Sequence, residues 1–338
     1  MTASDELLSV ENLSVGFHTY RGDIKAVRGV SLSVKPGEIL GIVGESGCGK
    51  SVTIHAVMGL LPRENSFIAG GKIVFQGQDI TDWDDEQYCH LRGQDMAMIF
   101  QDPMTALNPV MTIGAQMTEG IMLHEGISGQ EARQKAVPLL ERVGIRQAEE
   151  RMNSYPHEFS GGMRQRVMIA MALICRPKLL FADEPTTALD VTIQAQILEL
   201  LAELRQEYGM AIVLISHDLG VIASICDRVA VMYAGKVVEQ GSARDIFFHT
   251  SHAYTQGLLK SLPRLDASRD EALPVILGQP PDLLLDVEGC GFWPRCQYAM
   301  KVCRSVAPEA VTIGEGHCAW CWRAYLKQQE TGEVKLHE

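Results

Sequence analysis

Long apolar runs are missing from this sequence. The longest apolar stretch with helical spacing covers residues 167–175, well short of the ~20 residues that a bilayer-crossing helix needs. Residues 1–6 also lack the basic start and the apolar run of a secretory signal peptide. These absences argue against a membrane-spanning helix. They predict a cytoplasmic protein whose contact with any membrane is made through a partner.

A basic excess is missing as well. The 338 residues include 30 Lys and Arg against 42 Asp and Glu, which gives a net charge of −12. Proteins that bind nucleic acid broadly present a basic face, so this balance argues against a nucleic-acid partner. Hydrophobic residues make up 46% of the chain and charged residues 21%. These proportions are typical of a globular protein with a substantial core.

Four short apolar runs are present, and each ends at a polar or glycine-rich turn. They cover residues 39–43, 96–100, 179–182 and 212–215. Runs this short and apolar, separated by stretches with helical spacing, indicate buried strands of a parallel sheet in an α/β protein. Ligands of such sheets bind beyond the carboxyl ends of the strands. We therefore expect the four turns to meet at one edge.

The first turn matches the phosphate-binding loop pattern. It reads Gly44, Glu45, Ser46, Gly47, Cys48, Gly49, Lys50 and Ser51, and the helix that begins there continues through Val52. Glycines allow backbone N–H groups to wrap a phosphate, which the positive end of the helix also attracts. We expect Lys50 to reach the outer phosphates of ATP and Ser51 to ligate Mg²⁺. A chance glycine-rich turn is the alternative, which the flanking strand and helix disfavour.

The third apolar run ends at Asp183 and Glu184. In nucleotide-binding folds an Asp at this position holds Mg²⁺, and the adjacent Glu is placed to polarise an attacking water as general base. An Asp-Glu pair at a strand end is by itself usually a solvated turn. Its combination with the phosphate loop favours the catalytic interpretation.

Between these two motifs, Ser160, Gly161 and Gly162 begin a helix that Ser160 caps. An ordinary capped helix start would explain these three residues alone. The order of all the motifs, however, resembles that of the ABC ATPase family over roughly residues 7–245. That order is the phosphate loop, Gln101, the Ser160-Gly161-Gly162 signature, Asp183-Glu184, Ala188-Leu189-Asp190 and His217.

The resemblance implies a head-to-tail pair of ATPases, in which each ATP lies between the phosphate loop of one subunit and the signature of the other. The signature residues would then bind the γ-phosphate of the partner's nucleotide. Gln101 would sense Mg²⁺ and the attacking water, His217 would contact the γ-phosphate, and Asp190 would contact the opposite subunit. An aromatic residue normally stacks on the adenine. Phe17 matches that position, and Tyr20 is a plausible substitute. The alternative interpretation is that either residue is only a half-buried member of a strand.

The implied fold is a P-loop ABC nucleotide-binding domain over residues 1–245. It would combine a RecA-like parallel sheet, an antiparallel β subdomain and a helical signature subdomain at about 102–165. Residues 246–338 would form a small Cys-rich C-terminal domain. This tail resembles that of the D-type ATPases of oligopeptide and dipeptide permeases. The resemblance is carried by Ser251-His252-Ala253-Tyr254-Thr255, Leu262-Pro263 and Gly278-Gln279-Pro280-Pro281.

This closer resemblance implies an ATPase that powers import of oligopeptides or dipeptides across the bacterial inner membrane, at its cytoplasmic face. The implied partners are two transmembrane permease subunits, a second homologous ATPase and a periplasmic or lipid-anchored solute-binding protein. Import of nickel, glutathione or another small solute is the main alternative, because cargo is chosen by proteins outside this chain. A non-transport ABC ATPase is a distant alternative, since the chain has one phosphate loop and no heptad run.

Five of the nine cysteines lie late in the chain: Cys290, Cys296, Cys303, Cys318 and Cys321. In a reducing compartment such a cluster favours a metal over disulfides. Its spacing does not suit the short pairs of a structural zinc site, whereas four thiolates on irregular loops can hold an iron–sulfur cluster. Free thiols in a packed tail are the alternative. The permease ATPases are similar in carrying a [4Fe–4S] cluster, which implies Cys290, Cys296, Cys303 and Cys321 as ligands, with Cys318 as the substitute for Cys321.

Overall fold

The computed structural model describes residues 6–187, 189–262 and 275–331. Two of the motif residues, Ala188 and Pro263, lie outside these ranges. Contacts between Cα atoms divide the chain into two compact units. The first unit comprises Met1–Leu7, Val34–Ile39 and Asp82–Ile215, and the second comprises Leu8–Ser33, Leu40–Thr81 and Ser216–Glu338.

Three parallel strands form the sheet of the first unit: β6 (Met96–Ile99), β7 (Leu179–Asp183) and β8 (Ala211–Ser216). β7 lies between the other two, with Leu179 opposite both Met96 and Ala211. Every residue of the three strands is buried, which explains their continuous apolar sequence, because parallel strands are covered on both faces. The strands predicted at 179–182 and 212–215 are confirmed, and the one predicted at 96–100 is confirmed up to Ile99, because Phe100 follows the strand and is exposed.

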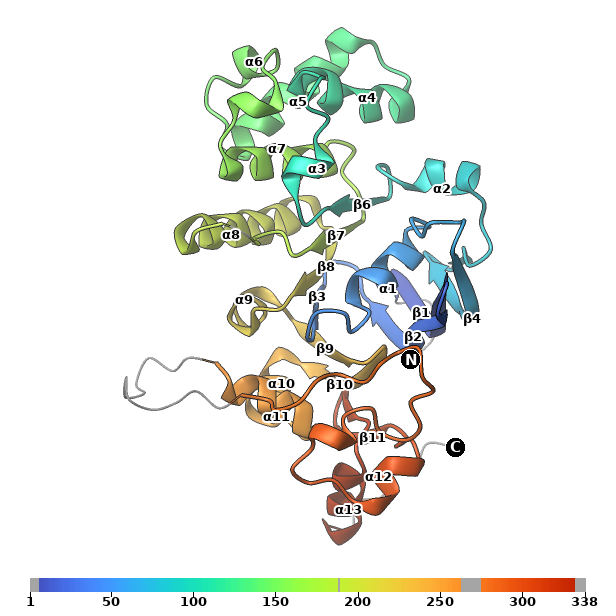
Figure 1. The fold of residues 1–338 in the computed structure, drawn as a ribbon. Helices are drawn as coiled ribbons and strands as arrows, with labels where there is room; N and C mark the ends of the chain where they lie inside the picture. Colours follow the sequence, from blue (N-terminus) through green and yellow to red (C-terminus); the bar gives the residue numbers. More distant parts are fainter. Residues whose placement is uncertain (1–5, 188, 263–274, 332–338) are drawn as a thin grey trace. The chain divides into compact units, whose positions relative to one another are not determined.

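The first unit also contains the helices labelled α2 to α8 in Figure 1. They are α2 (Asp85–Leu91), α3 (Pro103–Ala106), α4 (Ile113–Glu125), α5 (Gly129–Arg142), α6 (Ala148–Arg151), α7 (Gly161–Leu173) and α8 (Val191–Tyr208). The 3₁₀ turn η1 (Pro156–Glu158), which the figure does not label, precedes α7. Capping residues set several of their ends. Ser128 and Glu131 exchange side-chain and backbone hydrogen bonds at the start of α5, and Gly209 ends α8 in the left-handed conformation.

An apolar stripe with helical spacing runs along α8. Ile193 is only half-buried, and the remaining members are buried: Ile197, Leu200, Leu201 and Leu204. α8 is the longest described helix, with 18 residues. Within the described part of the chain, no helix is long and apolar enough to cross a bilayer.

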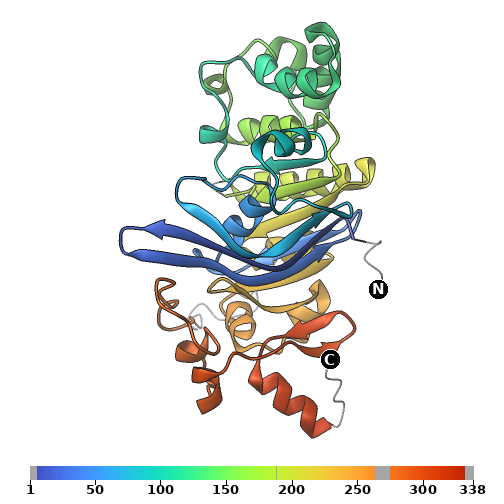
Figure 2. The ribbon, with the colours of Figure 1, turned by 90° about the vertical axis from the view of Figure 1, so that its right-hand side faces the viewer.

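The second unit contains an antiparallel sheet in the strand order β2–β1–β4–β5. Its strands are β1 (Leu8–Thr19), β2 (Gly22–Val34), β4 (Ser66–Phe75) and β5 (Gln78–Asp79). Figure 2 shows β1 and β2 as a long hairpin. Buried residues alternate with partly exposed ones toward the end of β2, a pattern typical of a sheet with one covered face.

A further set of strands in the second unit runs in the order β3–β9–β10–β12–β11. β3 (Ile39–Val43), which confirms the strand predicted at 39–43, is parallel to β9 (Arg228–Tyr233). β9, β10 (Lys236–Ser242), β12 (His317–Ala319) and β11 (Val311–Gly314) then pair antiparallel in turn. The tail therefore adds two short strands beside β10.

The remaining helices of the second unit are short. They are α1 (Lys50–Val57), α9 (Leu219–Ile225), α10 (Ala243–Phe248), α11 (Ala253–Lys260), the 3₁₀ turn η2 (Trp293–Arg295), α12 (Lys301–Ser305) and α13 (Trp322–Thr331).

A buried carboxylate on β10 joins the tail to the preceding strands. Glu239 is 0% exposed and accepts hydrogen bonds from Thr250 Oγ1 (2.7 Å) and the Ser251 N–H (2.6 Å). It also pairs with His317 Nε2 of β12 at 3.0 Å. Burial would raise the pKa of Glu239, but these hydrogen bonds hold it below its ordinary value. The network thus keeps a charged group satisfied inside the fold.

Candidate active site

The phosphate-binding loop joins β3 to α1 in the second unit. Two of its glycines have no room for a side chain. A Cβ on Gly44 would lie 2.2 Å from the Met232 carbonyl oxygen, and one on Gly49 would lie 2.6 Å from the Ala26 carbonyl oxygen. Gly49 also has a φ of +100°, which side chains disfavour. The glycines therefore let the backbone fold tightly at the N-terminus of α1, where helix N–H groups attract an anion.

Lys50 begins α1, and its side chain turns back over the loop. Its Nζ donates to the carbonyl oxygens of Gly44 (2.8 Å) and Glu45 (3.1 Å), and the residue is only 6% exposed. The ammonium is therefore held against the loop that phosphate oxygens would enter. Ser51 and Val52 follow in the first turn of α1 and are half-buried. Cys48 is buried, and burial raises the pKa of its thiol.

The acidic pair lies at the end of β7 in the first unit, where Asp183 is the last strand residue and is buried. Glu184 follows with a φ of +47°, and its N–H donates to the Ile215 carbonyl oxygen at 3.0 Å. Its carboxylate accepts hydrogen bonds from Gln101 Nε2 and Thr187 Oγ1, both at 2.9 Å. The structure thus brings Gln101 and Glu184 together, although 83 positions separate them in the chain.

The signature residues lie at the start of α7 in the first unit. Ser160 is the N-cap, and its Oγ accepts from the Met163 N–H at 3.4 Å. Ser160 and Gly161 are exposed, and nothing lies within 4 Å of a Cβ built on Gly161. A ligand can therefore approach the backbone closely at this helix end. Asp190 caps α8 in the same way, with Oδ1 accepting from the Ile193 N–H at 2.9 Å.

The other predicted nucleotide contacts lie in the second unit. His217 is exposed and directly follows β8. Phe17 is half-buried in β1, and Tyr20 is 97% exposed after the end of that strand. The predicted Mg²⁺ ligands are divided between the units: Ser51 belongs to the second, whereas Gln101 and Asp183 belong to the first.

Four cysteines of the tail line one small cavity of about 20 Å³. They are Cys290, Cys296, Cys303 and Cys321. Cys318 does not line it; its thiol instead lies 3.7 Å from Thr312 Oγ1 on β11. Burial raises the pKa of Cys290 to about 11, with smaller contributions from the other three thiols. Among the residues that the structure describes, no group of three or more His, Cys, Asp or Glu side chains is arranged to hold a metal ion.

The donor types therefore fit an iron–sulfur cluster, whereas their present spacing does not form a ready metal site. Thiolate ligation requires loss of the four thiol protons, and burial raises the pKa of Cys290 and of Cys296. Of the five cysteines in the tail, Cys318 is the one that does not line this cavity.

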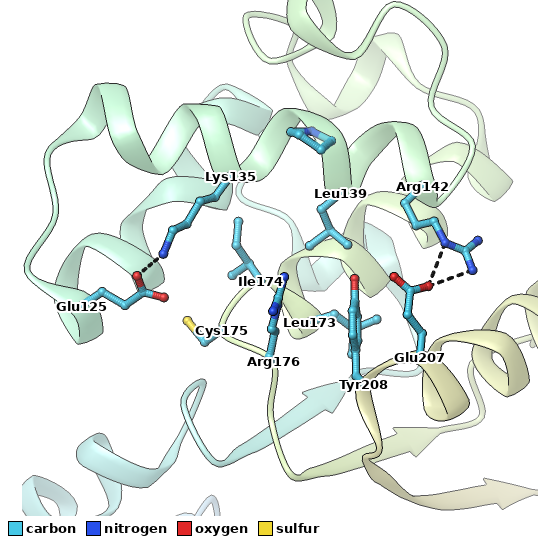
Figure 3. Close-up of a pocket in the computed structure, with 11 residues that line it drawn as sticks. Glu125, Lys135, Leu139, Arg142, Leu173, Ile174, Cys175, Arg176, Glu207 and Tyr208 are labelled. Carbon is cyan, nitrogen blue, oxygen red and sulfur yellow. Dashed lines mark hydrogen bonds and ion pairs between the residues drawn. The ribbon is translucent and has the colours of Figure 1, made fainter.

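A larger cavity of about 640 Å³ lies in the first unit and contains none of the predicted site residues. Figure 3 shows that Lys135 pairs with Glu125, and Arg142 with Glu207, along its sides. The Arg176 guanidinium lies over the Tyr208 ring, 5.6 Å from its centroid. Because both ion pairs are already formed, these four groups offer a phosphate little uncompensated charge.

Two contacts of the phosphate loop were missed by sequence reasoning. The Glu45 N–H donates to Tyr254 Oη, and the Glu45 carboxylate pairs with Arg295. These partners lie 209 and 250 positions further along the chain, so no local pattern connects them to the loop. Arg295 lies between the predicted ligands Cys290 and Cys296 in the sequence.

Comparisons with known proteins agree with these motifs. The family model for "ABC transporter" matches residues 27–187, and the model for "Oligopeptide/dipeptide transporter, C-terminal region" matches residues 238–303. The dipeptide transport ATP-binding protein DppD of Bacillus subtilis is 51% identical over 94% of this chain and 95% of its own length. The oligopeptide transport ATP-binding protein OppD of Escherichia coli is 53% identical over 90% of each chain.

The fold has a counterpart among solved structures. A dimeric, post-hydrolysis state of the ATP-binding cassette MJ0796, bound to ADP and Pi, has a TM-score of 0.63 and 28% identity to this chain. The match covers 70% of this chain and 99% of that one.

Proposed function

Because this chain belongs to the ABC transporter family, and within it to the ATP-binding proteins of oligopeptide and dipeptide transporters, we propose that it binds and hydrolyses ATP to power the import of short peptides. The observation that carries the proposal is the Glu184 carboxylate. It is held by Gln101 and Thr187 at the end of a buried strand, as a general base for an attacking water must be.

We assign the remaining roles by position. Lys50 and the loop amides would bind the phosphates, with Phe17 against the adenine. Ser51, Gln101 and Asp183 would hold Mg²⁺, whose positive charge would offset the negative charge of the phosphates. His217 would contact the γ-phosphate.

The signature residues favour a composite site with a second ATPase. Ser160 and Gly161 are exposed at the start of α7, where a partner's γ-phosphate can meet helix N–H groups. The related cassette MJ0796 is dimeric in its structure with ADP and Pi. We therefore propose a homologous partner ATPase, which Asp190 would also contact.

The names of the relatives guide the rest of the assembly. We propose two transmembrane permease subunits, a solute-binding protein, and a peripheral position at the cytoplasmic face of the inner membrane. Residues 1–245 would act as the ATPase domain and 246–338 as a C-terminal domain specific to peptide importers.

Transport in vesicles tests the cargo. The full transporter would be reconstituted with its solute-binding protein, and uptake of a labelled dipeptide and a labelled pentapeptide compared with uptake of Ni²⁺ and glutathione. We expect ATP-dependent peptide uptake that a Glu184→Gln subunit abolishes. Uptake of Ni²⁺ or glutathione without peptide would select the alternative cargo.

A second proposal concerns the cysteine cavity. We propose that Cys290, Cys296, Cys303 and Cys321 hold a [4Fe–4S] cluster, which would cross-link the loops of the tail. The support is that these four thiols line one cavity and Cys318 does not. The four residues would lose their protons on binding, and folding of this region would then depend on the metal.

Anaerobic purification tests the cluster directly. We expect brown protein with iron and sulfide in cluster stoichiometry, and we expect Cys303→Ser to bleach it. Cys318→Ser is the matched control and should keep the colour. If protein that has never been exposed to air contains zinc instead of iron, the cluster is refuted, but a metal site formed by the four thiolates still holds.

A further inference from the structure

The outer side of the phosphate loop is held by the tail. The Glu45 N–H donates to Tyr254 Oη at 2.8 Å. The carboxylate of the same residue pairs with Arg295 through two parallel bonds, Nη1 to Oε2 at 2.8 Å and Nη2 to Oε1 at 3.0 Å. The loop is thus fixed at one residue by both its backbone and its side chain.

The Arg295 side chain is itself fully engaged. Besides Glu45, Nη1 donates to Tyr233 Oη (3.2 Å), Nη2 to the Ile276 carbonyl oxygen (3.1 Å) and Nε to the Leu277 carbonyl oxygen (3.0 Å). A guanidinium has five N–H donors, and these five contacts match them in number. Only 6% of the side chain is exposed. Arg295 therefore has a single well-defined position, which a surface ion pair would not give it.

The aromatic residues around this pair connect it to the cysteine cavity. The Tyr254 ring is fully buried and packs against Tyr233 and Phe292, with ring centroids 4.6 and 5.3 Å apart. Phe292 also lines the cysteine cavity. The turn that carries Arg295 begins with the Trp293 N–H bonded to the Cys290 carbonyl oxygen (3.0 Å) and ends at Cys296. One short segment therefore carries two of the four cysteines and the arginine that grips the loop.

We propose that Arg295 and Tyr254 are positioning residues for the phosphate loop, and that nucleotide affinity therefore depends on the fold of the cysteine-lined turn. The proposal rests on the proposed function only in that the loop binds ATP. A loop that must present several N–H groups to one phosphate loses affinity when one of its residues is free to move. Loss of one well-aligned hydrogen bond from the loop to the charged phosphate costs on the order of 10–100-fold in affinity.

The test measures Mg-ATP binding to the purified full chain by calorimetry, with thermal unfolding recorded alongside. We expect Arg295→Ala to weaken binding on the order of 10–100-fold. Tyr254→Phe keeps the packed ring and removes only the hydroxyl that accepts from Glu45, so it should weaken binding on the order of tenfold with little change in melting temperature. Arg304→Ala is the matched control, because the Arg304 guanidinium stacks over Trp293 in the same region, whereas Glu45 of the loop is bound by Arg295 and Tyr254.

A double-mutant cycle tests whether Arg295 acts on the loop through Glu45. If Arg295 acts through Glu45, then Arg295→Ala should change affinity little when Glu45→Ala is already present. Cys296→Ser should weaken ATP binding in the parent chain and have little effect in Arg295→Ala. Parental affinity in folded Tyr254→Phe and Arg295→Ala would overturn the proposal, and Tyr254→Phe alone decides if Arg295→Ala does not fold. Parental affinity in folded Cys296→Ser would overturn the dependence on the turn. Failure of the unaltered chain to bind Mg-ATP would instead refute the proposed function.

Discussion

At the scale of single residues, Glu184 occupies a backbone conformation that its side chain does not favour. Its φ of +47° costs a residue with a Cβ about 1–2 kcal/mol. The conformation is held by the backbone bond to Ile215 and by the bonds from Gln101 and Thr187 to its carboxylate. Backbone strain that the surrounding hydrogen bonds maintain indicates that the orientation of the Glu184 side chain has a function.

Replacement of the carboxylate by an amide tests its role as base. We expect Glu184→Gln to bind ATP normally and to hydrolyse it ~10²–10⁴-fold more slowly, because a positioned general base contributes about that much. The ATP-bound dimer should then accumulate. Turnover in the assembled transporter and nucleotide occlusion are the measurements, and near-normal turnover would remove Glu184 from the mechanism.

Lys50 should act one step earlier. Its ammonium is held by the carbonyl oxygens of Gly44 and Glu45, and we expect it to exchange these partners for phosphate oxygens when ATP binds. Lys50→Ala should therefore lose nucleotide binding itself, as judged by calorimetry with Mg-ATP. Binding at parental affinity with only turnover lost would contradict this order of events.

At the scale of elements, the start of α7 is the surface that we propose for the partner ATPase. Ser160 caps the helix and is exposed, like Gly161 beside it. Ser160→Arg should leave Mg-ATP binding by the isolated subunit intact, since the phosphate loop is unchanged, and should abolish turnover at the partner's site. Weaker binding by the isolated subunit would contradict the composite site.

The sequence predicted best those elements whose pattern is local. The run at 39–43 coincides with β3 (Ile39–Val43), and the run at 179–182 lies within β7 (Leu179–Asp183), because burial on both faces leaves a continuous apolar run within a few residues. β12 was not predicted, since a three-residue strand carries no period. Glu239 was missed for a related reason: its burial depends on His317, 78 positions away.

The site shows the same division. The motifs predicted the loop, the acidic pair and the signature, because each has its own local chemistry. The hold of Arg295 on Glu45 joins residues 250 positions apart. Only the folded chain reveals it.

At the scale of the whole molecule, two buried groups make stability depend on pH. His252 is 1% exposed, and burial lowers its pKa to about 4, although Glu239 nearby acts in the opposite sense. Between about pH 6.5 and pH 4 the unfolded chain binds a proton that the folded chain does not. The lowered pKa of Glu239 acts in the same direction at still lower pH. The folded state therefore loses stability as pH falls.

Urea unfolding at pH 7.5, 6 and 5 measures this loss. The contribution of His252 is full above about pH 6.5 and amounts to at most about 3 kcal/mol across the window. His252→Asn retains an acceptor for the Tyr254 N–H, which now bonds to Nδ1 at 3.1 Å, and removes the titrating ring. The variant should show a flatter dependence on pH. An unchanged dependence would mean that another group is responsible.

The pairing of β12 with β10 also bears on how the chain is made. Glu239 on β10 meets His317 on β12, which is synthesised 78 residues later. At translation speeds of about 5–20 residues per second, the edge of β10 waits roughly 4–16 s for its covering strand. An uncovered edge strand is a template for pairing with other chains. A nascent or prematurely ended chain that stops before residue 317 should therefore be a target for chaperones and proteases, even though its phosphate loop is already complete.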